Sequence, residues 1–175
     1  MMPEQFFAQL GFIASANDLA AKNRLELGPH AHHIRKIEAP IELIRTDFEH
    51  TFIERWKSYL GDGLTKLFRD ALEHAMKNAV YRAAYLIDNE NVASLFTYKD
   101  KDCAGREVMQ IGWIGIRESL HKEARLSVHR KLLEDIKGLN ADIYQAGIHL
   151  FNVRSQKFFL KLGFKPACIH LKLKS

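Results

Sequence analysis

The segment Tyr144–Phe164, YQAGIHLFNVRSQKFFLKLGF, decides the fold of this chain. It opens with apolar residues at every second position, which is the spacing of a half-buried strand. Asn152 then stands where a side-chain oxygen can accept hydrogen bonds from the free N–H groups of a helix start. Gly163 stands where a helix ends in a left-handed residue. The segment therefore predicts a strand over 142–150, a helix over 153–162 and a last strand over 164–174.

The residues before this segment predict two helices and then a three-stranded meander. Turn-forming residues at 88–91 and a charged stretch with a glycine at 99–106 separate the alternating segments, so we expect the meander to be antiparallel. The predicted strands are 34–44, 81–87, 92–98 and 108–116, and the predicted helices are 46–60, 64–79 and 124–138. The strands 108–116 and 142–150 should lie adjacent and parallel, because helix 124–138 supplies the crossover that parallel neighbours need.

The first 33 residues predict a helical extension. Apolar residues between Pro3 and Leu27 fall at loosely helical spacing, and Gly28-Pro29 stops the pattern. We therefore expect residues 1–33 to form a helical N-terminal extension, suited to docking on a protein partner, and residues 34–175 to form one domain.

Composition limits the class of protein. The chain has 175 residues, 47% of them hydrophobic, which is enough for one core and too few residues for two ordinary domains. It contains no apolar run near the ~20 residues of a membrane span and no signal-peptide pattern, so we expect a cytoplasmic protein without membrane contact. The net charge of +5 favours anionic partners. Nucleic acid would suit that charge, but no motif supports it.

Cysteine and histidine predict neither a disulfide framework nor a metal site. Cys103 and Cys168 are far apart and lack metal-ligand spacing, which indicates two reduced thiols. The cluster His30-x-His32-His33 has no cysteine or acidic partner at a matching spacing, so it is read as a polar loop and no metal is expected.

The order of the predicted elements resembles the GNAT (N-acetyltransferase-like) superfamily over residues 37–174. Residues 109–116, MQIGWIGI, are similar to the family's fourth strand. The closing unit resembles the family's fifth strand and last helix, which end in Tyr-x-Lys-x-Gly-Phe where this chain has residues 159–164, FLKLGF. The resemblance implies an α/β (α+β) fold with a mixed, mostly antiparallel sheet and flanking helices.

The resemblance also implies acetyl-CoA or another acyl-CoA as cofactor. In the family, backbone groups of the fourth strand meet the pantetheine arm, and a glycine-rich loop holds the pyrophosphate at a helix start. The equivalent loop here, residues 120–127, has no glycine, although basic side chains in it could neutralise phosphate. The residues that the resemblance assigns to the cofactor are Trp113, Ile114, Gly115, Ile116, His121, Lys122, Ala124, Arg125, Asn152 and Phe159.

Phe159 stands where the family has the tyrosine that protonates the leaving thiolate. Phenylalanine cannot donate a proton, so another group must act if the chain is an enzyme. Candidates by residue type are Tyr144, His149 and Tyr98 for the acid, and Glu107 and Glu118 for a base working through water. By strand parity Tyr144 and His149 point to opposite faces, so they cannot serve the same side of the sheet.

Two functions follow from this resemblance. The first is an acyl-CoA-dependent N-acyltransferase with a modified cofactor loop, acting on a small-molecule or protein amine. The second is a GNAT-like binding or structural module without catalysis, because both the loop and the acid position depart from the family pattern. Residues 122–164 are similar to short, degenerate GNAT-like proteins of bacteriophages, and this alternative predicts a virion-associated protein.

Overall fold

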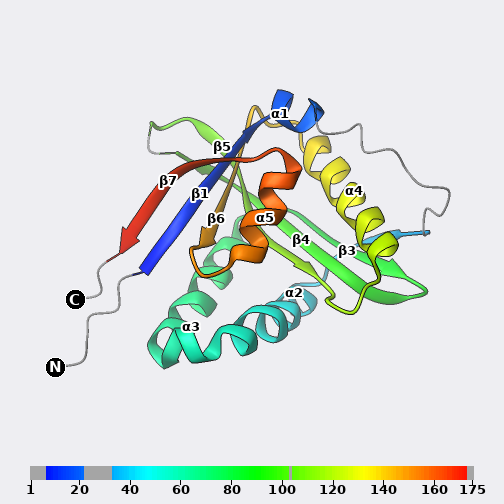
Figure 1. Cartoon of the computed structure of the whole chain (residues 1–175), viewed down its shortest axis with the longest axis horizontal. Helices are drawn as coiled ribbons and strands as arrows, with labels where there is room; N and C mark the ends of the chain where they lie inside the picture. Colours follow the sequence, from blue (N-terminus) through cyan, green and yellow to red (C-terminus); the bar gives the residue numbers. More distant parts are fainter. Residues whose placement is uncertain (1–6, 22–32, 103, 173–175) are drawn as a thin grey trace.

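The computed structural model describes residues 7–21, 33–102 and 104–172, and it shows a mixed α/β architecture (Figure 1). The strands are β1 (Phe7–Ser15), β2 (Arg35–Glu38), β3 (Ala79–Ile87), β4 (Glu90–Lys101), β5 (Glu107–Ile116), β6 (Ile143–His149) and β7 (Lys165–Lys172). The helices are α1 (Ala16–Ala21), α2 (Ile41–Phe48), the π-helical turn η2 (Glu49–Ile53), α3 (Glu54–Lys77), α4 (Lys122–Gly138) and α5 (Val153–Leu162).

The strands of the described residues form one seven-stranded sheet in the order β2-β3-β4-β5-β6-β1-β7. Strands β5 and β6 run parallel and are connected through α4, whereas the other neighbours run antiparallel. The predicted mixed sheet with an antiparallel meander is confirmed, and so is the predicted parallel pair with its crossover helix.

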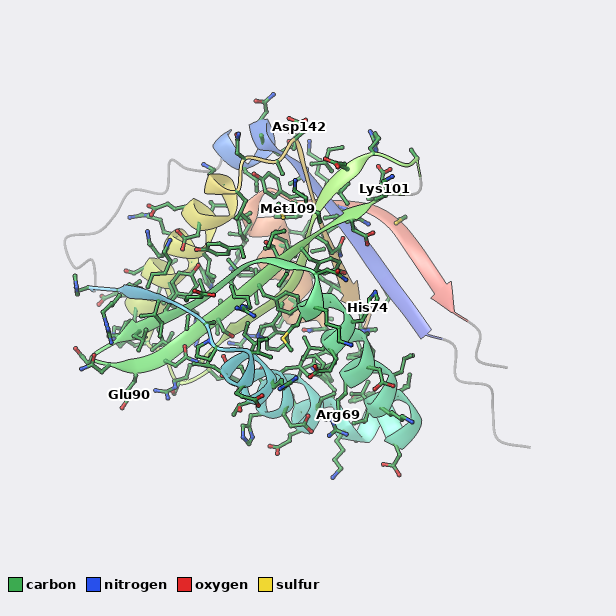
Figure 2. The ribbon with its side chains drawn as sticks, turned by 180° about the vertical axis from the view of Figure 1, so that it is seen from behind. Arg69, His74, Glu90, Lys101, Met109 and Asp142 are labelled. Carbon is green, nitrogen blue, oxygen red and sulfur yellow. The ribbon has the colours of Figure 1, made fainter. Side chains whose placement is uncertain are left out.

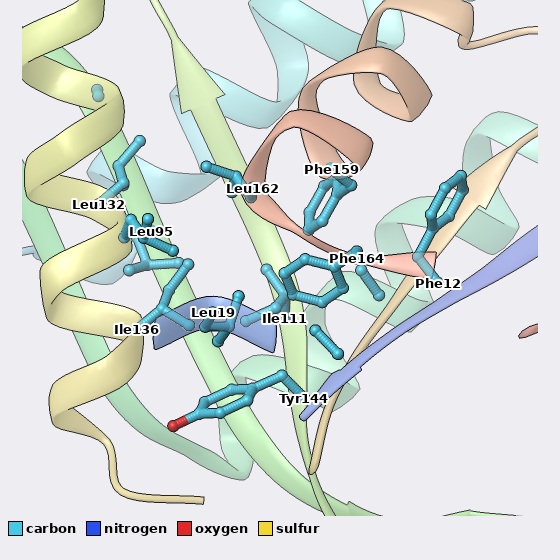
Figure 3. Close-up of a cluster of buried hydrophobic side chains, with 14 of the residues drawn as sticks. Phe12, Leu19, Leu95, Ile111, Leu132, Ile136, Tyr144, Phe159, Leu162 and Phe164 are labelled. Atoms are coloured by element: carbon cyan, nitrogen blue, oxygen red, sulfur yellow. The ribbon is translucent and has the colours of Figure 1, made fainter. Parts of the chain in front are cut away.

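Helices cover both faces of the sheet, and the buried apolar side chains of the described residues gather in a cluster on each face. On one face, α4 and α5 pack on the sheet through residues such as Leu132, Ile136 and Phe159 (Figure 3). On the other face, α2, η2 and α3 pack on Phe96 and Trp113. Figure 2 shows the molecule from behind, with α3 carrying Arg69 and His74. The sheet lies between the two clusters, and the site lies where β5 and β6 separate.

The predicted helical N-terminal extension is wrong for residues 7–15, which form β1. This strand lies between β6 and β7, and Phe12 is fully buried. Pairing on both edges satisfies its backbone groups, and this outweighs the weak helical spacing. A helix begins only after Ser15, which with Asp18 forms a capping box: Asp18 N–H donates to Ser15 Oγ, and Ser15 N–H donates to Asp18 Oδ2. Residues 16–21 form α1, and residues 1–6 and 22–32 of the predicted extension lie outside the described residues.

The strand predicted over 34–44 is shorter than expected. Strand β2 ends at Glu38, and Pro40 is the N-cap of helix α2, because proline lacks the N–H that the middle of a strand would need and a helix start can do without. The two helices expected after it run almost continuously through α2, η2 and α3. Their boundary survives as a kink at Gly61, which has φ 61° and ψ 173°. In the described part of the chain, no helix has the length and apolar character needed to cross a membrane.

Candidate functional site

Strands β5 and β6 pair at one end and separate at the other. Residues Met109–Ile111 of β5 pair with Tyr144–Ala146 of β6. Beyond that point residues 113–116 pair with β4 and no longer with β6, and residues 147–149 pair with β1 and no longer with β5. The facing backbone groups of the two diverging strands are thus left to line a gap, and a ligand with amide groups could hydrogen-bond to them.

A β-bulge marks the point where the strands separate. The register between β4 and β5 shifts so that Phe96 faces Trp113 while Thr97 faces Ile111, which leaves Gly112 as the extra residue. A Cβ atom at Gly112 would lie 2.1 Å from Cε2 of the buried Phe96 ring, so the position has no room for a side chain. The bulge turns the rest of β5 away from β6.

The Trp113 indole anchors this end of β5 on the α2 side. Its Nε1–H donates to Ser94 Oγ at 3.0 Å, and the Ser94 hydroxyl donates to Asp47 Oδ2 at 2.5 Å. The edge of the indole also meets the ring of Phe48 at 5.3 Å between centroids. These contacts hold the partly buried Trp113 side chain against the cluster formed by α2 and η2.

A larger cavity of about 680 Å³ lies between α3 and the sheet at this gap. Its wall is mostly aliphatic and aromatic, with contributions from η2, α3, β4, β5, β6 and α5. His149 and Tyr98 are titratable side chains in the wall. Burial raises the pKa of Tyr98, and the negative charge of Asp100 adds to that shift.

A smaller cavity of about 310 Å³ lies on the other side of the gap and is rich in cationic side chains. Its lining includes Arg55, Arg125, Arg154, Lys157 and Lys161. It shares Phe52, Trp113, Ile114, Asn152, Ser155 and Phe159 with the larger cavity, so the two cavities meet at the gap. A ligand with an anionic end and a neutral end would fit this arrangement, with its anionic end in the smaller cavity.

The arginines of the smaller cavity already have partners. Glu118 Oε1 accepts from Arg154 Nη1 at 2.7 Å and also from Arg55 Nη1. Arg125 donates to the backbone oxygens of Glu118 at 2.7 Å and Leu120 at 3.0 Å. Among the residues that the structure describes, no ion pair involves Lys157 or Lys161, so these two ammonium groups are available to an anion.

Most of the residues assigned to the cofactor meet at the gap. Gly115, Ile116 and Arg125 line the smaller cavity, and Trp113, Ile114, Asn152 and Phe159 line both. Asn152 also caps α5 as predicted, since its Oδ1 accepts from Ser155 N–H at 3.2 Å, and Gly163 ends α5 with φ 99°. That any of these residues binds a cofactor stays a prediction.

The remaining cofactor assignments lie elsewhere. His121 caps α4 by accepting the Ala124 N–H at its Nδ1, 3.4 Å away. Ala124 is buried in the protein, and Lys122 is exposed. None of the three lines either cavity. Of the four residues at the start of α4 that the resemblance assigns to the cofactor, Arg125 is therefore the one that lines the smaller cavity.

Two predicted catalytic residues are placed away from both cavities. Tyr144 is 1% exposed in the core; its hydroxyl accepts from Ala141 N–H at 3.1 Å and donates to the backbone oxygen of Lys137. Figure 3 shows this ring lying apart from Phe159. Glu107 begins β5 opposite Lys101, at the end of the strand that precedes the paired stretch. Neither side chain lines either cavity, and the catalytic roles of Tyr144 and Glu107 stay predictions.

His149 is a predicted catalytic residue that does reach the site, as do Tyr98 in the larger cavity and Glu118 in the smaller one. His149 ends β6 and lines the larger cavity. Its ring meets the edge of Phe68 at 4.5 Å and stacks on Phe151 at 5.2 Å between centroids. His149 directly follows Ile148 on β6, so its side chain lies on the opposite face of the sheet from Ile148 and Tyr144, as the alternation of strand side chains predicts.

His129 is a site residue that sequence reasoning missed. It lies one turn after Arg125 on α4, lines the smaller cavity and meets the edge of Phe158 at 4.8 Å. Burial lowers the pKa of His129 to about 4, and the positive charges of Arg125, Lys161 and Arg154 add to the effect. Its i, i+4 spacing from Arg125 was the available signal.

The described residues also bear on metal binding. Within the described ranges, no three His, Cys, Asp or Glu side chains lie together so as to hold a metal ion. His30, His32 and Cys103 lie outside those ranges.

Comparison with known proteins identifies the fold. No family model and no curated protein matches the chain. Among solved structures, a conserved protein of unknown function from Staphylococcus epidermidis matches with a TM-score of 0.60 and 11% identity, over 98% of this chain and 62% of that chain. A GCN5-related N-acetyltransferase from Anabaena variabilis matches with a TM-score of 0.59 and 9% identity, over 96% of this chain and 40% of that chain. A possible acetyltransferase from Clostridium difficile matches with a TM-score of 0.51 and 14% identity, over 77% of this chain and 91% of that chain.

At these identities the likeness shows the fold alone: the chain has the fold of GCN5-related N-acetyltransferases. It spans less than two thirds of the Staphylococcus and Anabaena proteins. What those proteins do is therefore a hypothesis for this chain.

Proposed function

We propose that this chain binds an acyl-CoA thioester at the gap between β5 and β6 and transfers its acyl group to an amine. The observation that carries the proposal is the gap itself, where unpaired strand backbone leads directly into a cationic cavity. A pantetheine arm carries amides that can pair with strand backbone, and the phosphates of coenzyme A are anions. An acyl thioester presented at the gap would lie between the smaller cavity and the larger one.

The residues present can hold the phosphates of such a substrate with cationic side chains, whereas a glycine-rich loop holds them with backbone N–H groups. Arg125 uses its guanidinium on the carbonyls of Glu118 and Leu120, so it shapes the loop as well as adding charge. Lys157 and Lys161, one turn apart on α5, present ammonium groups to the same cavity. We therefore assign the phosphates mainly to α5.

Transfer would form a bond from the amine nitrogen to the acyl carbon and break the bond from that carbon to sulfur. The amine loses a proton and the thiolate of coenzyme A gains one. His149 is the titratable candidate on β6 beside the gap, and Tyr98 is a second one on β4. Phe159 can only provide contact surface to the thioester.

Replacement of the α5 lysines tests the proposal. The double variant Lys157→Ala/Lys161→Ala should weaken coenzyme A binding about tenfold or more by isothermal titration calorimetry, because each charged contact to an anion contributes on the order of 1 kcal/mol. The control Lys57→Ala/Lys77→Ala removes the same charge from exposed positions on α3 outside both cavities. It should leave the affinity unchanged. Equal affinity for all three proteins, or no binding of coenzyme A by the unchanged protein, refutes the proposal.

A second candidate function is a GNAT-fold module that does not catalyse transfer. It is favoured by Phe159, which is 6% exposed and packs against Phe12, Phe158 and Phe164 at 6.3, 5.4 and 4.9 Å between centroids. Under this alternative the chain is a structural or binding protein. Its virion-associated location, like the cytoplasmic location of the enzyme, is a prediction from the sequence.

The variant Phe159→Tyr separates the two candidates. We expect it to lower the free energy of unfolding by about 1–3 kcal/mol, because the new hydroxyl enters a nearly closed ring cluster. Thermal denaturation and thioester consumption with an amine should be measured on the same samples. A loss of stability without a gain in rate favours the non-catalytic module, whereas a faster reaction shows that only the proton donor was missing.

A further inference from the structure

The larger cavity is more extensive and more apolar than an acetyl group requires. Its volume of about 680 Å³ falls in the ~300–1,000 Å³ range of pockets that enclose drug-sized ligands. The rings of Phe52 and Phe68 and the aliphatic side chains of Leu64, Leu67 and Leu72 form much of the helical wall. Burial of an apolar group against such a wall is favourable, whereas an unpaired charge there is costly.

Polar groups are unevenly distributed over the wall. Gln110, His149, Asn152 and Ser155 lie on β5, β6 and the start of α5, beside the gap. On the helical side, the charged lining residues of the described chain are Lys66 and Asp70, which are exposed on α3 and therefore lie at the rim. A ligand that matches this distribution has its polar end at the gap and an apolar body towards α3.

In the proposed function coenzyme A occupies the smaller cavity, so the larger cavity remains for the second substrate, the amine. The cations of the smaller cavity take the phosphates, so the thioester reaches the gap from that side. The amine must reach the same carbon from the other side, through the larger cavity. The matching ligand is an amine with its nitrogen near His149 and its carbon chain or ring against Phe68 and Leu67.

We propose that the acceptor is a primary amine carried on an apolar body of medium size, which the larger cavity encloses. This inference rests on the proposed function for the transfer step, while the binding preference can be measured without any transfer. It excludes amines whose body carries further charges.

Three amines test the preference by calorimetry: n-octylamine below its micellar concentration, ethylamine and spermidine. Octylamine and ethylamine differ only in chain length, and spermidine has a chain of similar length with additional charges. Each methylene that becomes buried should tighten binding about threefold to fourfold. Octylamine should therefore bind at least about 30-fold more tightly than ethylamine, even if only half of its additional chain is enclosed, and spermidine should bind no better than ethylamine.

A variant that fills the cavity locates the binding. Ala71 is exposed on α3 and lines the cavity, so Ala71→Trp should reduce octylamine affinity at least tenfold without disturbing the core. The matched control is His74→Trp, at an exposed position on the same helix that does not line the cavity (Figure 2). It should change octylamine affinity less than twofold. Neither variant should alter coenzyme A affinity, and Leu67→Asp, at a 53% exposed lining position, is the second test if Ala71→Trp fails to fold.

The outcomes separate this inference from the proposed function. Equal binding of the three amines, or octylamine binding that Ala71→Trp leaves intact, overturns the inference. It is also overturned if octanoyl-CoA binds much more tightly than acetyl-CoA and Ala71→Trp abolishes that gain, because the cavity then holds the acyl chain. If octylamine binds as expected and coenzyme A does not bind at all, the larger cavity is supported as a site for an apolar amine and the transferase proposal is refuted.

Discussion

Phe12→Ala is expected to lower the free energy of unfolding by about 3–5 kcal/mol, the usual cost of removing a fully buried phenyl ring. The ring has no exposed surface and lies 6.3 Å from the ring of Phe159. It belongs to β1, which pairs with β6 on one edge and β7 on the other. Urea denaturation followed by circular dichroism measures the loss, and an unchanged m value would show that the unfolded state is the same.

The neighbouring residue provides the control for this prediction. Ile13 is on the same strand but is only half-buried. Ile13→Ala should therefore cost clearly less than Phe12→Ala, since the cost follows the apolar area removed and the cavity left behind. If Phe12→Ala costs less than 1 kcal/mol, β1 is not the interior strand that the structure shows.

Acidification from pH 6.5 to pH 4 should destabilise the protein by about 3 kcal/mol through His129 alone. The pKa of His129 is about 4 in the folded protein because of burial and its cationic neighbours, compared with the ordinary histidine value of 6.5 in the unfolded chain. Between these values the unfolded chain binds more protons than the folded one. Stability is therefore fully present above pH 6.5 and is lost as the pH falls through the window, and the loss from this group levels off once the pH is below the folded pKa.

His129→Phe is the matched variant for the pH experiment. It keeps a ring against Phe158 and removes the titrating group. The free energy of unfolding from urea titrations at pH 7, 6, 5 and 4 should then change much less across this window than in the unchanged protein. The carboxylate of Asp18, whose pKa Lys165 and Ser15 lower to about 2, contributes its loss of stability at lower pH. An equal pH dependence in both proteins would contradict the assignment to His129.

The sequence predicts the second half of the fold better than the first half, because the residues that specify the second half act on close neighbours in the sequence. Asn152 and Gly163 act within one helical turn, so their residue types already determine the ends of α5. β1 depends on partners that follow it by more than a hundred residues. Its apolar residues fit a strand and a loose helix equally, and the capping pair Ser15 and Asp18 was the one local signal that the helix begins late.

The sequence predicts those parts of the candidate site that depend on where a residue stands along a strand. Alternation along β5 fixes which residues stand at its end, and Trp113 to Ile116 do line the cavities. Catalytic side chains are harder to predict, because parity gives the face of a strand and not the distance from the gap. Tyr144 is therefore in the core near the start of β6, whereas His149, at the other end of the same strand, lies in the cavity wall. The i, i+4 spacing places His129 on the same face of α4 as Arg125, but whether its ring reaches the cavity depends on the packing of α4 against α5.

The interior position of β1 constrains the order in which the chain can fold. The hairpins β3-β4 and β4-β5 join near neighbours in sequence, whereas Gly11 pairs with Gly147 on one side and Cys168 on the other. Closing so long a loop costs entropy before any of these contacts can form, so half of the sheet has a high contact order. During synthesis β1 emerges long before either neighbour, with both edges open to pairing with other chains. Protection of β1 by a chaperone would therefore matter most before β7 has been translated.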